Sequence, residues 1–83
     1  MNELENLKKK ILYRSSYRGT KEMDILLTSF VKFYINKLTM LELKDLSNLL
    51  EKEDEVIYNF YYNGKNDILK ENNITILLKK FKI

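Results

Sequence analysis

The 83-residue chain contains no cysteine, no histidine and no proline, and only two glycines. Without cysteine it has no disulfide framework, no thiolate nucleophile and no zinc-finger or iron–sulfur site. Without histidine it lacks the usual proton shuttle near neutral pH and the commonest nitrogen ligand for metals. These absences exclude most hydrolytic triads and most zinc sites. We therefore expect neither a catalytic enzyme nor a metal site.

The remaining composition is that of a folded protein. Of the residues, 45% are hydrophobic and 33% are charged, which predicts a single small domain over residues 1–83. No apolar run approaches the roughly 18 residues that a membrane span needs. The first residues are acidic and polar, unlike a signal peptide. We expect a soluble, cytoplasmic protein that does not insert directly into membranes and is a monomer when free.

Hydrophobic residues recur at helical spacing along nearly the whole chain, which predicts an all-α fold. The first stripe is formed by Leu4, Leu7, Ile11 and Leu12, and it indicates a helix over residues 3–16. A longer stripe predicts a second helix over residues 21–37. Three more short stripes, within residues 43–50, 56–61 and 74–81, complete a small single-domain bundle of about five helices.

Polar residues mark where several of these helices begin or end. Thr39 and Glu42 form a capping-box pattern at the start of the third helix. The acidic run at residues 53–55 suits the positive dipole end of the fourth helix, and Gly64 is placed to end it. The alternating residues 74–77 also fit a strand, but a lone strand would have no pairing partner, so we predict a helix that begins at the preceding asparagines.

The two arginines are the first candidate functional residues. Arg14 and Arg18 are one helical turn apart in a chain whose other thirteen basic residues are lysines. Because a guanidinium can hold a carboxylate or phosphate in two places, such a pair indicates a defined acceptor. The alternative is internal pairing, for instance of Arg18 with Glu22 or Asp24, which would hold the corner between the first two helices.

The residues after Arg18 have simpler interpretations. Gly19 supplies either a left-handed or a closely approached backbone position between two helices. Glu22 and Asp24 are two positions apart, so a helix would point them to nearly opposite sides, which argues against a carboxylate pair for acid–base catalysis. Further along, Tyr58 and Tyr62 are four positions apart and predict a surface stripe of the kind found at protein interfaces.

The sequence is also compatible with two functions of other kinds. A net charge of +3 and the lysines at residues 8–10 suggest a small helical nucleic-acid-binding module. Acidic residues are interspersed among the basic ones, whereas phosphate contacts should gather lysine and arginine on one face, so we expect no nucleic-acid partner. A purely structural bundle with no partner would leave Arg14 and Arg18 paired inside the chain.

The segment of residues 13–24, YRSSYRGTKEMD, resembles the RGxxE signature of the flavinator family. This family comprises the bacterial FAD assembly factor SdhE and mitochondrial succinate dehydrogenase assembly factor 2. The likeness covers residues 6–65. It implies a five-helix all-α domain. It also implies an assembly factor that promotes covalent attachment of FAD to a histidine of the flavoprotein subunit of succinate dehydrogenase, and in some bacteria of fumarate reductase.

The resemblance also implies which residues meet that partner. Arg18, Gly19 and Glu22 match the motif positions on the partner-binding surface. The flanking candidates are Arg14, Tyr17 and Asp24. Tyr17 stands where many bacterial members carry arginine. Because this chain has no histidine, we expect the flavin link to form on the partner, with no cofactor bound stably here.

Overall fold

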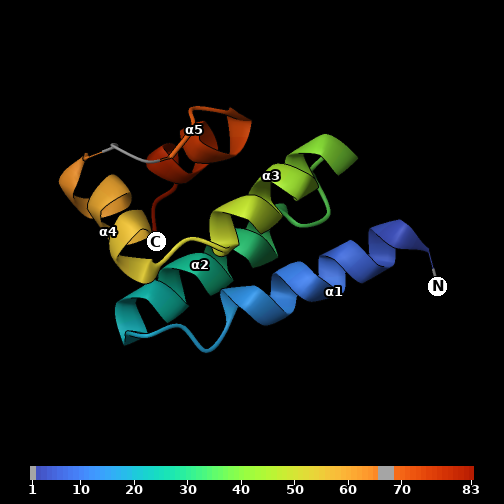
Figure 1. Ribbon diagram of the computed structural model, residues 1–83, viewed down its shortest axis with the longest axis horizontal. Coiled ribbons are helices and arrows are strands. Elements are labelled where there is room, and N and C mark those ends of the chain that lie inside the picture. Colours follow the sequence, from blue (N-terminus) through green and yellow to red (C-terminus); the bar gives the residue numbers. More distant parts are fainter. Residues whose placement is uncertain (1, 66–68) are drawn as a thin grey trace.

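The computed structural model describes residues 2–65 and 69–83, and within them the chain forms five helices and no strand (Figure 1). The helices are α1 (Glu3–Ser15), α2 (Lys21–Tyr34), α3 (Met40–Leu50), α4 (Asp54–Asn63) and α5 (Asn73–Lys80). The predicted all-α fold is therefore confirmed, and residues 74–77 are helical. None of the described helices is long and apolar enough to cross a bilayer.

Local side-chain caps explain most of the helix boundaries. The Thr39 hydroxyl accepts the Glu42 backbone N–H at 3.2 Å, and the Glu42 carboxylate accepts the Thr39 N–H at 2.9 Å, which confirms the predicted capping box. Asn72 caps α5 in the same reciprocal manner. Gly64 ends α4 with a φ of 66°, in the left-handed region that glycine adopts without steric cost.

The core lies along the predicted hydrophobic stripes. Each helix contributes fully buried side chains, and α2 and α3 contribute most of them. The completely buried large residues are Ile11, Met23, Leu26, Leu27, Phe30, Val31, Leu43, Leu46, Ile57, Ile74 and Leu78. In α2, α3 and α5 these positions repeat at three- and four-residue intervals, so one face of each of these helices is removed from water. The predicted surface stripe on α4 is also present, with the Tyr58 and Tyr62 rings 4.7 Å apart.

Two details of the predicted helices are wrong. Leu4 and Leu12 of α1 are 36% and 41% exposed, whereas Ile11 is fully buried. Leu12 lies about 100° around the helix from Ile11, at the edge of the stripe, and Leu4 lies in the first helical turn. The second helix ends at Tyr34 instead of residue 37, because residues 35–37 form turns.

The packing of the helices brings two distant connections together. α1 packs against α2 and α3, and α5 packs against α3 and α4. As Figure 1 shows, the C-terminal ends of α1 and α3 lie at the same side of the molecule. The α1–α2 corner, residues 16–20, is therefore in contact with residues 50–54, where α3 leads into α4. Arg18 and Gly19, two of the predicted site residues, lie at this junction.

Candidate partner-binding site

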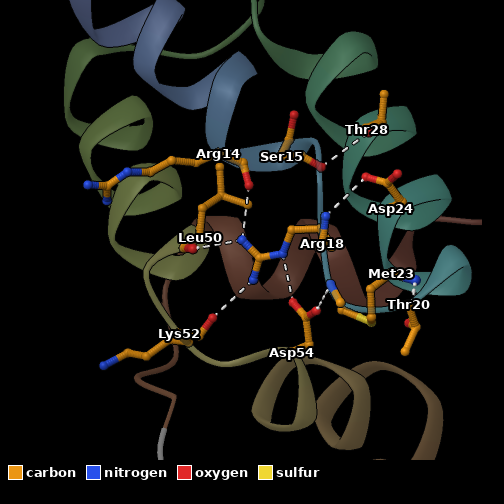
Figure 2. Close-up of polar contacts among 11 residues, drawn as sticks. Arg14, Ser15, Arg18, Thr20, Met23, Asp24, Thr28, Leu50, Lys52 and Asp54 are labelled. Carbon is orange, nitrogen blue, oxygen red and sulfur yellow. Dashed lines mark hydrogen bonds and ion pairs between the residues drawn. The ribbon is translucent and has the colours of Figure 1, made fainter.

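Arg18 lies at the centre of the junction between the α1–α2 corner and the start of α4 (Figure 2). Its Nε donates a hydrogen bond to Asp54 Oδ1 at 2.7 Å. The other two guanidinium nitrogens donate to backbone carbonyls of Arg14, Leu50 and Lys52, each at 3.0 Å. The side chain is only 11% exposed. One guanidinium thus joins the ends of α1 and α3 and the beginning of α4.

Gly19 contacts the same carboxylate from its backbone. Its N–H donates to Asp54 Oδ2 at 2.6 Å, so the two oxygens of Asp54 accept from consecutive residues of the corner. A Cβ atom built on Gly19 would lie 3.0 Å from Oδ2, closer than ordinary van der Waals contact. The close approach that the sequence predicted is therefore present, and it is made to an acidic side chain of the same chain.

The internal pairing weighed from the sequence exists, but with another acid. Arg18 pairs with Asp54, 36 positions away, and not with Glu22 or Asp24. Asp24 instead accepts the backbone N–H of Arg18 at 3.4 Å, which ties the corner to the first turn of α2. Among the described residues, Glu22 is exposed on that turn and no ion pair is found for it.

Arg14 is also paired within the chain, but at the surface. Its Nη1 lies 2.7 Å from Glu51 Oε1, and the two side chains are 35% and 51% exposed. The hydrogen bond and the charge of Arg14 lower the pKa of the Glu51 carboxyl. Because water competes for both groups, this ion pair can open at low cost. The two arginines therefore have different roles: Arg18 is enclosed, and Arg14 remains accessible.

Tyr17 carries the unusual backbone of the corner. Its φ is 58°, and in the described part of the chain it is the one residue other than glycine with a positive φ. Its side chain is 86% exposed, and its ring centroid lies 6.2 Å from that of Tyr13, which is 73% exposed. The left-handed position expected at the corner is thus at Tyr17, whereas the sequence offered Gly19 for it.

Tyr13 and Asp54 are site residues that the sequence reasoning missed. Asp54 was interpreted only as part of the acidic start of the fourth helix, and Tyr13 carried a signal of its own. Tyr13 stands within the motif-bearing segment, four positions before Tyr17, and that spacing was the available signal. Both tyrosines line an open groove whose other wall is formed by residues 50–54, including the exposed Lys52 and Glu53. The groove is bordered by charges of both signs and by two aromatic rings, which suits contact with a protein surface.

The polar groups of the corner are bonded to one another. Within residues 2–65 and 69–83, no group of three or more acidic side chains is placed to hold a metal ion. Every buried side-chain nitrogen and oxygen in these residues has a hydrogen-bond partner. The corner is therefore a hydrogen-bonded polar network beneath a surface that exposes two tyrosine rings and charges of both signs.

Comparison with known families agrees with the motif at this corner. The family model described as the flavinator of succinate dehydrogenase matches residues 9–82, which is most of the chain. The chain belongs to this flavinator family. The match continues beyond residue 65, where the sequence resemblance ended, and includes α5. The names of curated relatives agree with this family, since they read succinate dehydrogenase assembly factor 2 and FAD assembly factor SdhE.

Curated members of the family align with much of this chain. It is 45% identical over 60 residues to succinate dehydrogenase assembly factor 2, mitochondrial, of Dictyostelium discoideum, covering 72% of this chain and 43% of that protein. It is 37% identical over 68 residues to the protein of the same name in Yarrowia lipolytica, covering 82% and 46%. It is 38% identical over 47 residues to the FAD assembly factor SdhE of Acetobacter pasteurianus, covering 57% and 43%.

The chain thus aligns with less than half of the length of these relatives. No solved structure gives a significant match. The names of the first two relatives place those proteins in mitochondria, and the cytoplasmic location expected for this chain stays a prediction.

Proposed function

We propose that this chain binds the flavoprotein subunit of succinate dehydrogenase and promotes covalent attachment of FAD to a histidine of that subunit. Fumarate reductase is the second client that the proposal includes. The observation that supports it is that some residues in and beside the family motif are bonded within the chain while others are exposed. Arg18 and the Gly19 backbone are bonded inward, whereas Tyr17 and Glu22 are exposed beside them. Such a surface serves recognition, which supports an assembly factor that performs no chemistry itself.

The absence of histidine supports a flavin link that forms on the partner. A histidyl–flavin bond cannot form on a chain with no histidine, so the residues of this chain act by binding and orienting the subunit. A binding protein promotes such a reaction by having a higher affinity for the competent conformation of its partner than for the others. We propose that FAD stays with the flavoprotein subunit and that this chain holds no flavin stably.

The exposed side chains of the corner supply the proposed contacts. The Tyr13 and Tyr17 rings present large apolar faces with polar tips, the type of residue enriched at protein interfaces. Glu22 is available to pair with a cation of the partner. The accessible Arg14–Glu51 pair can exchange its internal bond for one across the interface. Arg18 and Asp24 support the corner from inside, and Gly19 allows the close approach of backbone and carboxylate.

The proposal is tested by in-gel flavin fluorescence of the denatured flavoprotein subunit. The subunit is co-expressed with this chain, without it, and with the variants Tyr17→Ala and Glu22→Gln. Leu41→Ala is the matched control, because Leu41 is 71% exposed on α3, away from the corner. Denaturation removes loosely bound FAD, so the fluorescence that remains is covalent. We expect the signal to rise with the wild type and the control, and to fall with both corner variants.

Equal fluorescence in every lane would overturn the proposal. In that case the binding of a DNA duplex over a range of salt concentrations should be measured next. A steep loss of affinity with added salt would indicate the nucleic-acid-binding alternative, because phosphate contacts release counterions.

A further inference from the structure

Asp54 occupies a position that joins the two halves of the site. It is the first residue of α4, and its two oxygens accept hydrogen bonds from Arg18 Nε and Gly19 N at 2.7 and 2.6 Å. Its side chain is 24% exposed. Since both donors belong to the α1–α2 corner, one carboxylate holds the direction of the Arg18 side chain and the path of the backbone that follows Tyr17 (Figure 2).

Tyr17 needs such support, because its backbone conformation is unfavourable for a residue with a Cβ atom. A positive φ brings Cβ close to the following carbonyl and persists in non-glycine residues only where the surroundings enforce it. On one side of Tyr17, the Ser16 N–H donates to the Tyr13 carbonyl at the end of α1. On the other side, Arg18 and Gly19 are both bonded to Asp54.

We propose that Asp54 is a positioning residue for the partner-binding surface. By fixing Arg18 and Gly19, it holds Tyr17 in its left-handed conformation and keeps the Tyr17 ring beside that of Tyr13. It acts through the corner and does not itself contact the partner. The family motif is thereby completed by a residue 35 positions after its glycine, in another helix.

The first experiment is nuclear magnetic resonance of the isolated chain, and it needs no partner. A positive φ brings the amide proton and Hα of one residue close together, so Tyr17 in the wild type should give a strong intraresidue NOE between them. The isosteric variant Asp54→Asn has one carbonyl oxygen for two donors. We expect it to weaken this NOE and those between the Tyr13 and Tyr17 rings, while circular dichroism shows that the helices remain.

Two further variants keep this experiment decisive. Glu55→Gln removes a charge from the next residue of α4 and should leave the Tyr17 signals unchanged, because Glu55 is exposed. Gly19→Ala crowds the Asp54 carboxylate without removing its charge, and should shift the Tyr17 signals if Asp54→Asn does not fold. Tyr17 signals that stay as in the wild type in both Asp54→Asn and Gly19→Ala would overturn the proposal.

The second experiment rests on the proposed function and uses the flavoprotein subunit with FAD. Asp54→Asn should lower covalent flavin by the same factor as Tyr17→Ala, and the double variant should show no additional loss, because both changes remove one contact. Factors that multiply in the double variant would show that Asp54 acts separately from Tyr17. If the wild type itself adds no covalent flavin, the proposed function fails, and the magnetic resonance experiment still decides the role of Asp54.

Discussion

The replacement of Gly19 by alanine tests why glycine is required at the corner. The new Cβ would lie 3.0 Å from Asp54 Oδ2, so the carboxylate would have to move by a few tenths of an ångström. That oxygen accepts the Gly19 N–H, and the other oxygen is held by Arg18 at 2.7 Å. The movement therefore lengthens charge-assisted hydrogen bonds, whose loss costs about 1.5–3 kcal/mol each.

A smaller effect opposes this loss. Alanine restricts the unfolded chain more than glycine does, which stabilises a protein by about 0.4–1 kcal/mol where the backbone conformation is compatible. The φ of Gly19 lies outside the left-handed region, so alanine is compatible there. We expect Gly19→Ala to lower the free energy of unfolding by about 1–2 kcal/mol, at about 4–8 °C of Tm for each kcal/mol in a domain of this size.

The decisive measurement is the thermal unfolding of Gly19→Ala, monitored by circular dichroism, in the wild-type background and in the Asp54→Ala background. In Asp54→Ala the obstructing carboxylate is gone, so the same glycine change should raise stability by about 0.4–1 kcal/mol. Gly64→Ala is the control: no atom lies within 4 Å of its new Cβ and its φ is 66°, so its cost of about 1–2 kcal/mol should be equal in both backgrounds. An equal loss from Gly19→Ala with and without the Asp54 carboxylate would refute the close-approach explanation.

Three further predictions follow from the polar contacts. Arg18→Lys should lower the free energy of unfolding by about 2–3 kcal/mol in thermal unfolding, because one lysine amine cannot reach all four acceptors of the guanidinium. Arg14→Lys, at an exposed ion pair, should change stability little, and equal losses in the two variants would contradict this difference. Arg14 lowers the pKa of Glu51 below 4.5 in the folded chain, so the ion pair stabilises the fold above pH 4.5 and stops doing so as the pH falls through the folded-state pKa. In urea unfolding, the difference in the free energy of unfolding between the wild type and Glu51→Gln should therefore disappear at acidic pH. The Tyr61 hydroxyl donates to the Phe81 carbonyl, so Tyr61→Phe should lower the free energy of unfolding by about 1 kcal/mol at neutral pH. Burial raises the pKa of Tyr61 above 10.0, so raising the pH above 10.0 should lower the free energy of unfolding of the wild type more than that of the variant.

Most of the fold could be predicted from the sequence because its signals are local. A helix buries residues three and four positions apart, so the stripe around Phe30 and the leucines of α3 were recognised directly. The capping pair Thr39 and Glu42 and the terminal glycine of α4 act over the same short distances. Leu12 was misplaced because spacing identifies a stripe and leaves its edges undefined until neighbouring helices pack against it.

The candidate site was only partly predictable. The motif identified the corner between α1 and α2, and Tyr17, whose φ is positive, was among the candidate residues. For internal pairing of Arg18 the sequence offered Glu22 or Asp24 as examples, since these acids are nearby in the chain, yet the acceptor is Asp54. Gly19 was expected to be either left-handed or closely approached; the close approach is present, whereas Tyr17 holds the left-handed position.

Which segments are helical, where several of their caps lie and which family the chain resembles could all be read from the sequence, because each depends on residues close together in the chain. That α1 and α3 end side by side, and so bring Asp54 against Arg18 and Gly19, is visible only in the folded chain. The physical reason is that a contact across 35 residues depends on how helices cross and pack. That packing bonds Arg18 and Gly19 of the motif to Asp54 and leaves Tyr17 exposed beside them.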